Sequence, residues 1–271
     1  MPILELLSYE FMQRAYLAGI AVAIVCPLIG VFLVLRRLSL LADGLGHVTF
    51  AGLAAGFLLG IYPLFAALVA ALIGAVGIER IRTRGRIAGD AAIAMFYTAG
   101  LAIGIVLVSR AGGFNANVLG YLFGSIAAVA LDDLLTVLGL AALVVALIAL
   151  FFKELLYLTF DEPSARAAGL PATAVNTLLS ALAAITTVAA MRIVGLLLVS
   201  SLMVLPALTA IRLASSFRGT LVIAVLAALI AVLVGLTASF YLDTAPGGTI
   251  VLTALALFGV ATLIEGRRSK G

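Results

Sequence analysis

Long apolar segments, separated by short polar connections, fill most of the 271-residue sequence. Each is close to the roughly 20 residues that an α-helix needs to cross about 30 Å of hydrocarbon. A transmembrane β-barrel would instead show short segments of alternating polarity. The pattern predicts an all-α transmembrane bundle of about nine spans, within limits of eight and ten: 11–35, 39–60, 62–82, 89–109, 134–152, 173–190, 193–213, 219–240 and 246–265.

The stretch 114–131 is ambiguous, because Gly, Asn and Ser interrupt it. We interpret it as a short re-entrant or interfacial helix rather than a tenth span. The basic residues favour this reading: with the N-terminus outside, only Arg14, Arg110 and Arg192 of the 16 Lys and Arg residues fall outside. Basic residues concentrate in cytoplasmic loops, and a tenth span would invert the second half of the chain and weaken that bias.

Composition places the chain in a lipid bilayer. Hydrophobic residues make up 65% of it and charged residues only 10%, whereas a soluble domain of this length needs a larger charged surface. The net charge of +4 does not indicate a nucleic-acid partner, because the basic residues lie in short loops and set the topology. No linker divides the sequence, so we expect one transmembrane domain, 1–271.

Glycines recur at intervals of four positions in two of the predicted spans. In lipid, such faces let helix backbones approach one another closely. We interpret these residues as packing positions of a compact bundle: Gly52, Gly56, Gly60, Gly100 and Gly104.

Asp43 and His47 stand out within an apolar, glycine-rich segment, and His47 is the only histidine. Their spacing of four places both side chains on one helix face. An ionisable side chain inside a span usually faces a cavity or a partner. A carboxylate with an imidazole suits a divalent transition metal, and an incomplete, weak site suits transport. Two other readings stay open: an Asp43–His47 hydrogen bond, or a helix cap by Asp43 with His47 incidental.

The other polar groups near or within spans have simpler interpretations. Hydroxyls in spans usually bond back to their own helix, which we expect for Ser200, Ser201, Thr209 and Thr237 rather than a place in a pathway. Asp90 is interpreted as an N-terminal cap. Solvated outer ends are expected for three acids, which could otherwise form an acidic mouth for cations: Asp132, Asp133 and Asp243.

The cytoplasmic segment 160–171 predicts a short helix. Asp161 or Glu162 can start it, Pro163 fits its first turn and Gly169 can end it. Such a helix could be a connector or a docking surface for a soluble partner.

Missing motifs exclude several activities. The chain has no G-x-x-x-x-G-K-[ST] loop, so it does not hydrolyse ATP itself, and no H-E-x-x-H zinc protease motif. It also lacks a G-x-S-x-G turn, so an intramembrane hydrolase has no nucleophile and base. An ion-gradient-driven carrier is the stronger alternative, although the inverted repeat typical of such carriers is not evident.

Four stretches, in this order, resemble the permeases of bacterial zinc, manganese and iron ABC importers. They are "LVLRRLSLLADGLGHVTFAGLAAG" (33–56), "TFDEPSARAAGLP" (159–171), "MRIVGLLLVSSLMVLPALTA" (191–210) and "YLDTAPGGTIVL" (241–252). The similarity runs through nearly the whole chain. Within the family, the amino-acid sequence of these stretches is most similar to that of zinc-uptake permeases.

The resemblance implies the fold of the vitamin- and siderophore-uptake ABC permeases, in the bacterial cell membrane. It implies a second permease copy, a separate cytoplasmic ATP-binding subunit that uses the ATP, and an extracytoplasmic metal-binding protein. Asp43 and His47 match the family's metal-coordinating pair. The family's coupling loop, which receives the ATPase's motion, matches 160–171, with these residues singled out: Asp161, Glu162, Pro163, Ala165, Arg166 and Gly169.

The resemblance therefore predicts a non-enzymatic permease that works by alternating access and binds no cofactor of its own. Zinc is the expected substrate, with manganese or iron as alternatives, because an Asp–His pair serves all three metals.

Overall fold

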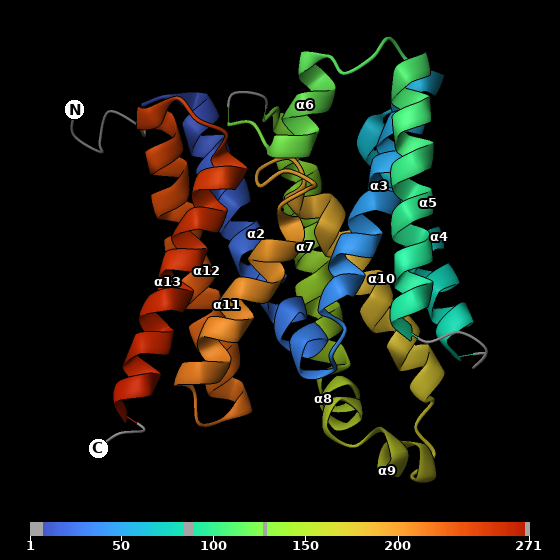
Figure 1. The fold of residues 1–271 in the computed structure, drawn as a ribbon, viewed down its shortest axis with the longest axis vertical. Helices are drawn as coiled ribbons and strands as arrows, with labels where there is room; N and C mark the ends of the chain where they lie inside the picture. Colours follow the sequence, from blue (N-terminus) through green and yellow to red (C-terminus); the bar gives the residue numbers. More distant parts are fainter. Residues whose placement is uncertain (1–7, 84–88, 127–128, 269–271) are drawn as a thin grey trace.

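The computed structural model describes residues 8–83, 89–126 and 129–268, which form helices joined by turns and contain no strand (Figure 1). Arg84, Arg86 and Lys270, which entered the charge argument, lie outside these residues. The helices are α2 (Glu10–Leu35), α3 (Ser39–Leu59), α4 (Pro63–Thr83), α5 (Gly89–Arg110), α6 (Ala116–Phe123), α7 (Leu131–Leu150), α8 (Phe152–Phe160), α9 (Glu162–Ala167), α10 (Ala172–Ala190), α11 (Val199–Leu213), α12 (Phe217–Leu242) and α13 (Pro246–Arg268).

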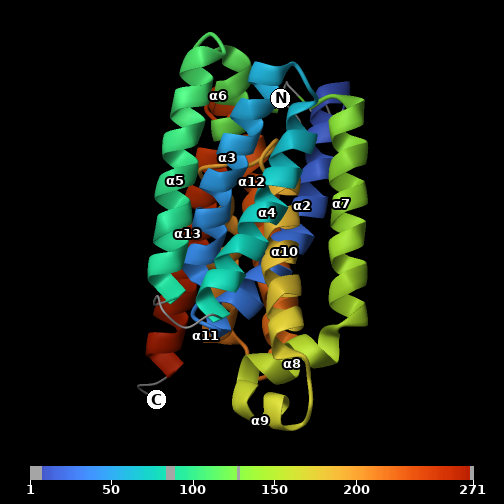
Figure 2. The same ribbon diagram turned by 90° about the vertical axis from the view of Figure 1, so that its right-hand side faces the viewer.

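The predicted helical membrane bundle is confirmed. Among the described residues, eight helices are long and apolar enough to cross a bilayer, and α11 is a shorter apolar helix. Successive long helices run in opposite directions. The turns that follow α2, α7 and α11 lie at or toward the end that also holds α8, α9 and the last turn of α13 (Figures 1 and 2). This end is the cytoplasmic one in the predicted topology.

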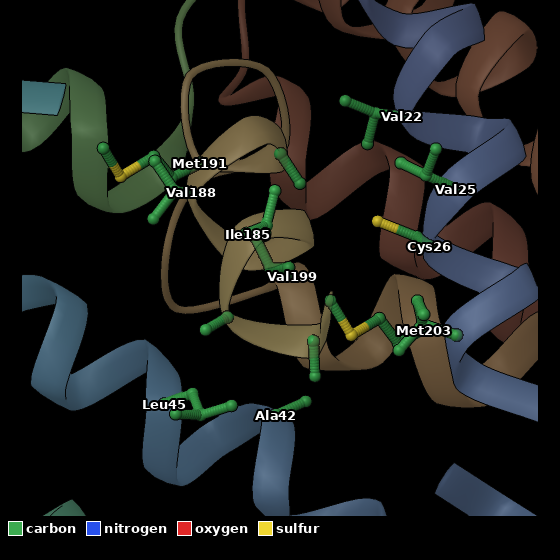
Figure 3. Close-up of a cluster of buried hydrophobic side chains, with 14 of the residues drawn as sticks. Val22, Val25, Cys26, Ala42, Leu45, Ile185, Val188, Met191, Val199 and Met203 are labelled. Carbon is green, nitrogen blue, oxygen red and sulfur yellow. The ribbon is translucent and has the colours of Figure 1, made fainter. Parts of the chain in front are cut away.

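The core lies between α2, α3, α10 and α11. In the apolar stretches of α2 and α10, 72% of the residues are buried, against 28% in α5 and α13. Figure 3 shows Val25 and Cys26 of α2 close to Met203 of α11, with Leu45 of α3 and Ile185 of α10 nearby. Cys26 is fully buried among apolar side chains. One side of α3 therefore packs against the central helices of the bundle.

The stretch 114–131 contains a short helix, as predicted, and not a tenth span. Helix α6 has eight residues and lies at the outer end of the bundle (Figure 1). The Asn115 side chain caps its start by accepting a hydrogen bond from the Val118 N–H at 3.0 Å. The described part of this stretch therefore covers the bundle rather than crossing it.

The predicted span 193–213 is wrong in its first part, because the helix begins only at Val199. The preceding segment 191–198 turns beneath α6, where the Leu196 N–H donates to the Tyr121 carbonyl oxygen at 2.9 Å. Gly195 has φ +87°, and a Cβ there would lie 2.3 Å from the Phe123 carbonyl carbon. These contacts satisfy backbone groups that would be orphaned in an interrupted helix within a membrane.

Four of the five glycines assigned to packing lie against a neighbouring helix or turn. A Cβ on Gly52 would lie 2.7 Å from the Ala66 carbonyl oxygen, and one on Gly56 would lie 2.9 Å from Pro63 Cα. Gly100 and Gly104 of α5 face α3. Gly60 does not share this role: it ends α3 in the left-handed conformation (φ +67°) with no heavy atom within 4 Å of its Cβ position, because the helix stops there.

The prediction that Asp133 is exposed to solvent at the outer end of its span is wrong. Its side chain is 4% exposed and pairs with Arg192 Nη2 at 2.8 Å. Tyr62 Oη donates to Asp133 Oδ1 at 3.0 Å. Burial and the charge of Asp133 raise the pKa of Tyr62 to about 12, so this phenol stays a donor. Asp133 thus ties α7 to the turns after α3 and α10, whereas Asp132 and Asp243 are exposed, as predicted.

We predict that Asp133→Asn destabilises the protein by on the order of 3 kcal/mol, because Arg192 then keeps a largely buried charge without its counter-ion. Thermal unfolding of the detergent-solubilised protein measures the effect. Asp132→Asn is the matched control, since that neighbouring carboxylate is exposed. Equal melting temperatures for the two variants would contradict a structural role for the pair.

Candidate functional site

Asp43 and His47 lie on the one polar face of the first half of α3. Between Leu41 and Phe50, only Asp43, His47 and Val48 are partly exposed, and the other residues are buried. Helix α3 begins at Ser39 and continues without interruption through both positions. The spacing of four therefore places carboxylate and imidazole on a common face, directed away from the packed core.

Two cavities meet at Asp43. One, of about 310 Å³, lies between α3, α11 and α13 and is lined by Ser39, Asp43, Ser200 and Ser201 among apolar side chains. The other, of about 170 Å³, lies between α3 and α5. The carboxylate of Asp43 thus borders open space on two sides, as expected of an ionisable group within a span.

Helix α5 approaches the backbone of α3 closely at His47. A Cβ on Gly100 would lie 2.6 Å from the His47 carbonyl carbon, and one on Gly104 would lie 2.3 Å from the Phe50 ring. One turn before Gly100, the Tyr97 ring stands edge-on to the His47 imidazole, with ring centroids 4.0 Å apart and planes at 61°. The glycines therefore allow a contact in which Tyr97 limits the orientation of His47.

Tyr97 is a site residue that the sequence analysis missed. Its spacing from Gly100 was the available signal, because a residue three positions before a packing glycine lies on the same helix face. Asp90, interpreted as a helix cap, lies in the first turn of α5 and lines the smaller cavity together with Asp43 and Tyr97.

Neither simpler reading of the Asp43–His47 pair matches the described contacts. No hydrogen bond joins the two side chains there, and the residue before α3 is Leu38, without a side-chain cap. The described part of the chain also contains no group of three or more His, Cys, Asp and Glu side chains that could hold a metal ion. Within one chain, the pair offers two ligands and leaves the remaining coordination positions open.

The hydroxyl groups divide into two kinds. Thr209 donates to the Leu205 carbonyl oxygen at 2.8 Å, and Thr237 to the Leu233 carbonyl oxygen at 2.7 Å. Both follow the expectation for hydroxyls in spans. Ser200 and Ser201, in the first turn of α11, instead line the larger cavity beside Asp43. They add oxygen donors to the surroundings of the carboxylate.

The segment 160–171 folds as a short helix at the cytoplasmic end, between α8 and α10 (Figure 2). Asp161 caps α9 by accepting a hydrogen bond from the Ser164 N–H at 3.0 Å. Hydrogen bonding to the Ser164 side chain and backbone lowers the pKa of Asp161. Pro163 lies in the first turn. Gly169 follows the helix with φ +84°, where glycine avoids the strain of a side chain. Ala165 is the only buried residue of α9.

Helix α9 forms one ion pair within itself and one with the rest of the bundle. Arg166 donates to Glu162 Oε1 from both Nε (3.0 Å) and Nη2 (2.6 Å). Arg36, at the end of α2, donates to the other carboxylate oxygen of Glu162. In the sequence Arg36 serves only as a topological charge, and no local pattern indicates this contact, because it joins residues 126 positions apart.

Comparisons with known proteins identify the family. The model of the ABC 3 transport family matches residues 8–265. The chain is 35% identical to the manganese transport system membrane protein MntC of Halalkalibacterium halodurans, over 95% of this chain and 88% of the relative. It is 30% identical to a protein of Haemophilus influenzae named "Probable iron transport system membrane protein", over 96% and 95% of the two chains.

The fold is also similar to a solved structure. A chain of PsaBC from Streptococcus pneumoniae, in complex with Fab, matches with a TM-score of 0.85 and 33% identity, over 96% of this chain and 95% of that one. With eight apolar helices long enough to span a bilayer among its described residues, this chain belongs to the ABC 3 transport family as a multi-pass membrane permease for metal ions.

Proposed function

We propose that this permease imports Mn²⁺ by alternating access and that Asp43 and His47 hold the ion transiently in the membrane. The observation that carries the proposal is the placement of this pair: the only partly exposed polar groups of a buried helix segment, beside two cavities. A carboxylate and an imidazole together bind divalent transition metals. Their incomplete coordination allows release as well as entry.

Manganese is proposed ahead of zinc for two reasons. Relatives of this chain are named for manganese or iron transport, and they give the zinc expectation no specific support. Ser200 and Ser201 also border the cavity at Asp43, and hard oxygen donors suit Mn²⁺ better than they suit softer ions. Fe²⁺ and Zn²⁺ are the competing substrates, since both accept the same pair of ligands.

A second copy of the permease would complete the site. One chain supplies a single Asp43–His47 pair, and its described residues form no larger ligand group. The cavities that border Asp43 lie beside α3, one against α11 and α13 and the other against α5. A homodimer that apposed these faces would bring two pairs together and offer four protein ligands.

Two further partners belong to the proposal. A cytoplasmic ATP-binding subunit would dock on the coupling loop 160–171, because this chain has no phosphate-binding loop of its own. An extracytoplasmic metal-binding protein would deliver the ion at the outer end, near α6. ATP binding and hydrolysis in the first partner would then switch the bundle between outward-open and inward-open states.

We predict that Asp43→Asn and His47→Gln each lower ATP-dependent Mn²⁺ uptake by on the order of 100-fold, because each removes a metal-binding group while keeping similar size. Uptake by the reconstituted permease–ATPase assembly measures the effect, and thermal unfolding confirms a folded protein. Asp132→Asn, an exposed carboxylate at the outer end, is the control. Normal uptake by either site variant would rule out the assigned pair.

A second prediction concerns Tyr97. Because its ring orients the imidazole, Tyr97→Phe keeps the wild-type KM for Mn²⁺, whereas Tyr97→Leu raises it about 2- to 10-fold, the equivalent of an aromatic contact of about 0.5–1.5 kcal/mol. The KM of ATP-dependent uptake distinguishes the two variants. An equal loss in both would mean that the hydroxyl group binds the metal directly and that ring packing is not the cause.

A further inference from the structure

Arg36 is a buried cation at the cytoplasmic end of the bundle. It forms the C-cap of α2, and its side chain is only 6% exposed. Its Nη2 donates to Glu162 Oε2 of α9 at 3.2 Å and to Asn176 Oδ1 of α10 at 2.7 Å. One guanidinium group therefore connects the α2–α3 turn with the coupling loop and with a central helix.

The turn that carries Arg36 is held firmly to α2. The Leu38 N–H donates to the Leu33 carbonyl oxygen at 2.8 Å, and the Arg37 N–H to the Val34 carbonyl oxygen at 3.0 Å. This is the Schellman pattern, with Arg37 in the left-handed position at φ +58°. An arginine there costs conformational energy that glycine would not. The geometry of the turn is thus fully specified by hydrogen bonds.

Helix α3 starts directly after this turn. Ser39 is its first residue, and the helix runs without a break through Asp43 and His47. In both views the turn lies inside the bundle relative to α8 and α9 (Figures 1 and 2). A displacement of the turn therefore moves the metal-binding pair with it, since an unbroken helix of two to three turns transmits movement as a rigid body.

Helix α9 has few other attachments to the bundle. Ala165 is its only buried residue, and Glu162 makes its cross-helix ion pair. Partial burial opposes ionisation of Glu162, but the hydrogen bond from Arg166 and the charge of Arg36 outweigh it and lower its pKa. The carboxylate is therefore charged at neutral pH and keeps its attraction for Arg36.

The arrangement is not a fully satisfied structural ion pair. Arg36 Nη1 is buried without a hydrogen-bond partner, and so is Oε1 of Glu79, a neighbouring carboxylate of α4. Buried ion pairs add little net stability compared with apolar packing. A buried cation with an unused donor, beside a carboxylate with an unused acceptor, can instead exchange partners when α9 moves.

We propose that Arg36 is the positioning residue that connects the coupling loop to the metal-binding helix: movement of α9 acts through Glu162 on Arg36, and through the α2–α3 turn on Asp43 and His47. This proposal rests on the proposed function. It assigns the coupling to a defined contact between α9 and α2, the ion pair of Glu162 with Arg36.

The test compares Arg36→Gln, Glu162→Gln and the double variant in the reconstituted permease–ATPase assembly. Each is expected to lower the Mn²⁺ transported per ATP hydrolysed by about 10-fold, with ATPase assembly, ATP hydrolysis and Mn²⁺ binding retained. The double variant should be no worse than either single one, because both remove the same contact. Arg36→Lys should restore part of the coupling, since it keeps the charge but not the planar fork.

Arg37→Gln is the matched control, because it removes the adjacent exposed charge and leaves the contacts of Arg36 in place. If Arg36→Gln does not fold, Glu162→Gln alone carries the test, since its side chain is 35% exposed. An unchanged transport-to-ATP ratio, or a parallel loss of assembly and hydrolysis, would overturn the proposal. Absence of Mn²⁺ transport in the unsubstituted assembly, supplied with the extracytoplasmic metal-binding protein, would instead contradict the proposed function.

Discussion

The cost of placing ionisable side chains in an apolar bundle is the constraint on which this structure depends. Asp43 and His47 lie in a helix whose neighbouring residues are buried, and such groups are stable in a membrane only beside a cavity or a partner. The bundle provides two cavities at Asp43 and a ring contact at His47. The glycines of α5 follow from the same requirement, because only a residue without a side chain lets α5 reach the backbone of His47.

At the cytoplasmic end of the predicted topology, an ionic network offsets the cost of burying a charged side chain. Arg36 is buried at the turn that leads into α3, and its charge is balanced by Glu162 of α9. One turn and one ion pair therefore connect the proposed metal-binding pair with the segment that would contact an ATPase. At the outer end, Asp133 and Arg192 lock α7 to the interrupted segment before α11. The two ionic clusters hold opposite ends of a bundle whose middle is almost wholly apolar.

Much of this architecture could be predicted from hydrophobic patterning. Eight of the nine expected spans match observed helices to within a few residues, because each is a continuous apolar run of membrane-crossing length. The late start of α11 could not be predicted, since 191–198 is largely apolar and its departure from helix depends on hydrogen bonds to α6 and on the left-handed Gly195. The burial of Asp133 escaped prediction for a similar reason: its partners, Tyr62 and Arg192, are distant in sequence.

For the candidate site, spacing placed Asp43 and His47 on one face, and the resemblance supplied their proposed role. Tyr97, Ser200 and Ser201 depend on how α5 and α11 approach α3, which no local pattern specifies. The identity of the metal is not encoded in the pair, because Asp and His serve zinc, manganese and iron alike. The serine hydroxyls that line the cavity at Asp43 became apparent only from the fold.

Metal uptake by the purified permease tests the central claim most directly, in liposomes supplied with its extracytoplasmic metal-binding protein and reconstituted with or without its ATP-binding subunit. Mn²⁺, Fe²⁺ and Zn²⁺ would be compared at equal free concentration, with ATP present or absent. The account predicts accumulation of Mn²⁺ ahead of the other two ions, and only when both the ATP-binding subunit and ATP are present. Accumulation by the permease alone, driven by an ion gradient without ATP, would contradict it.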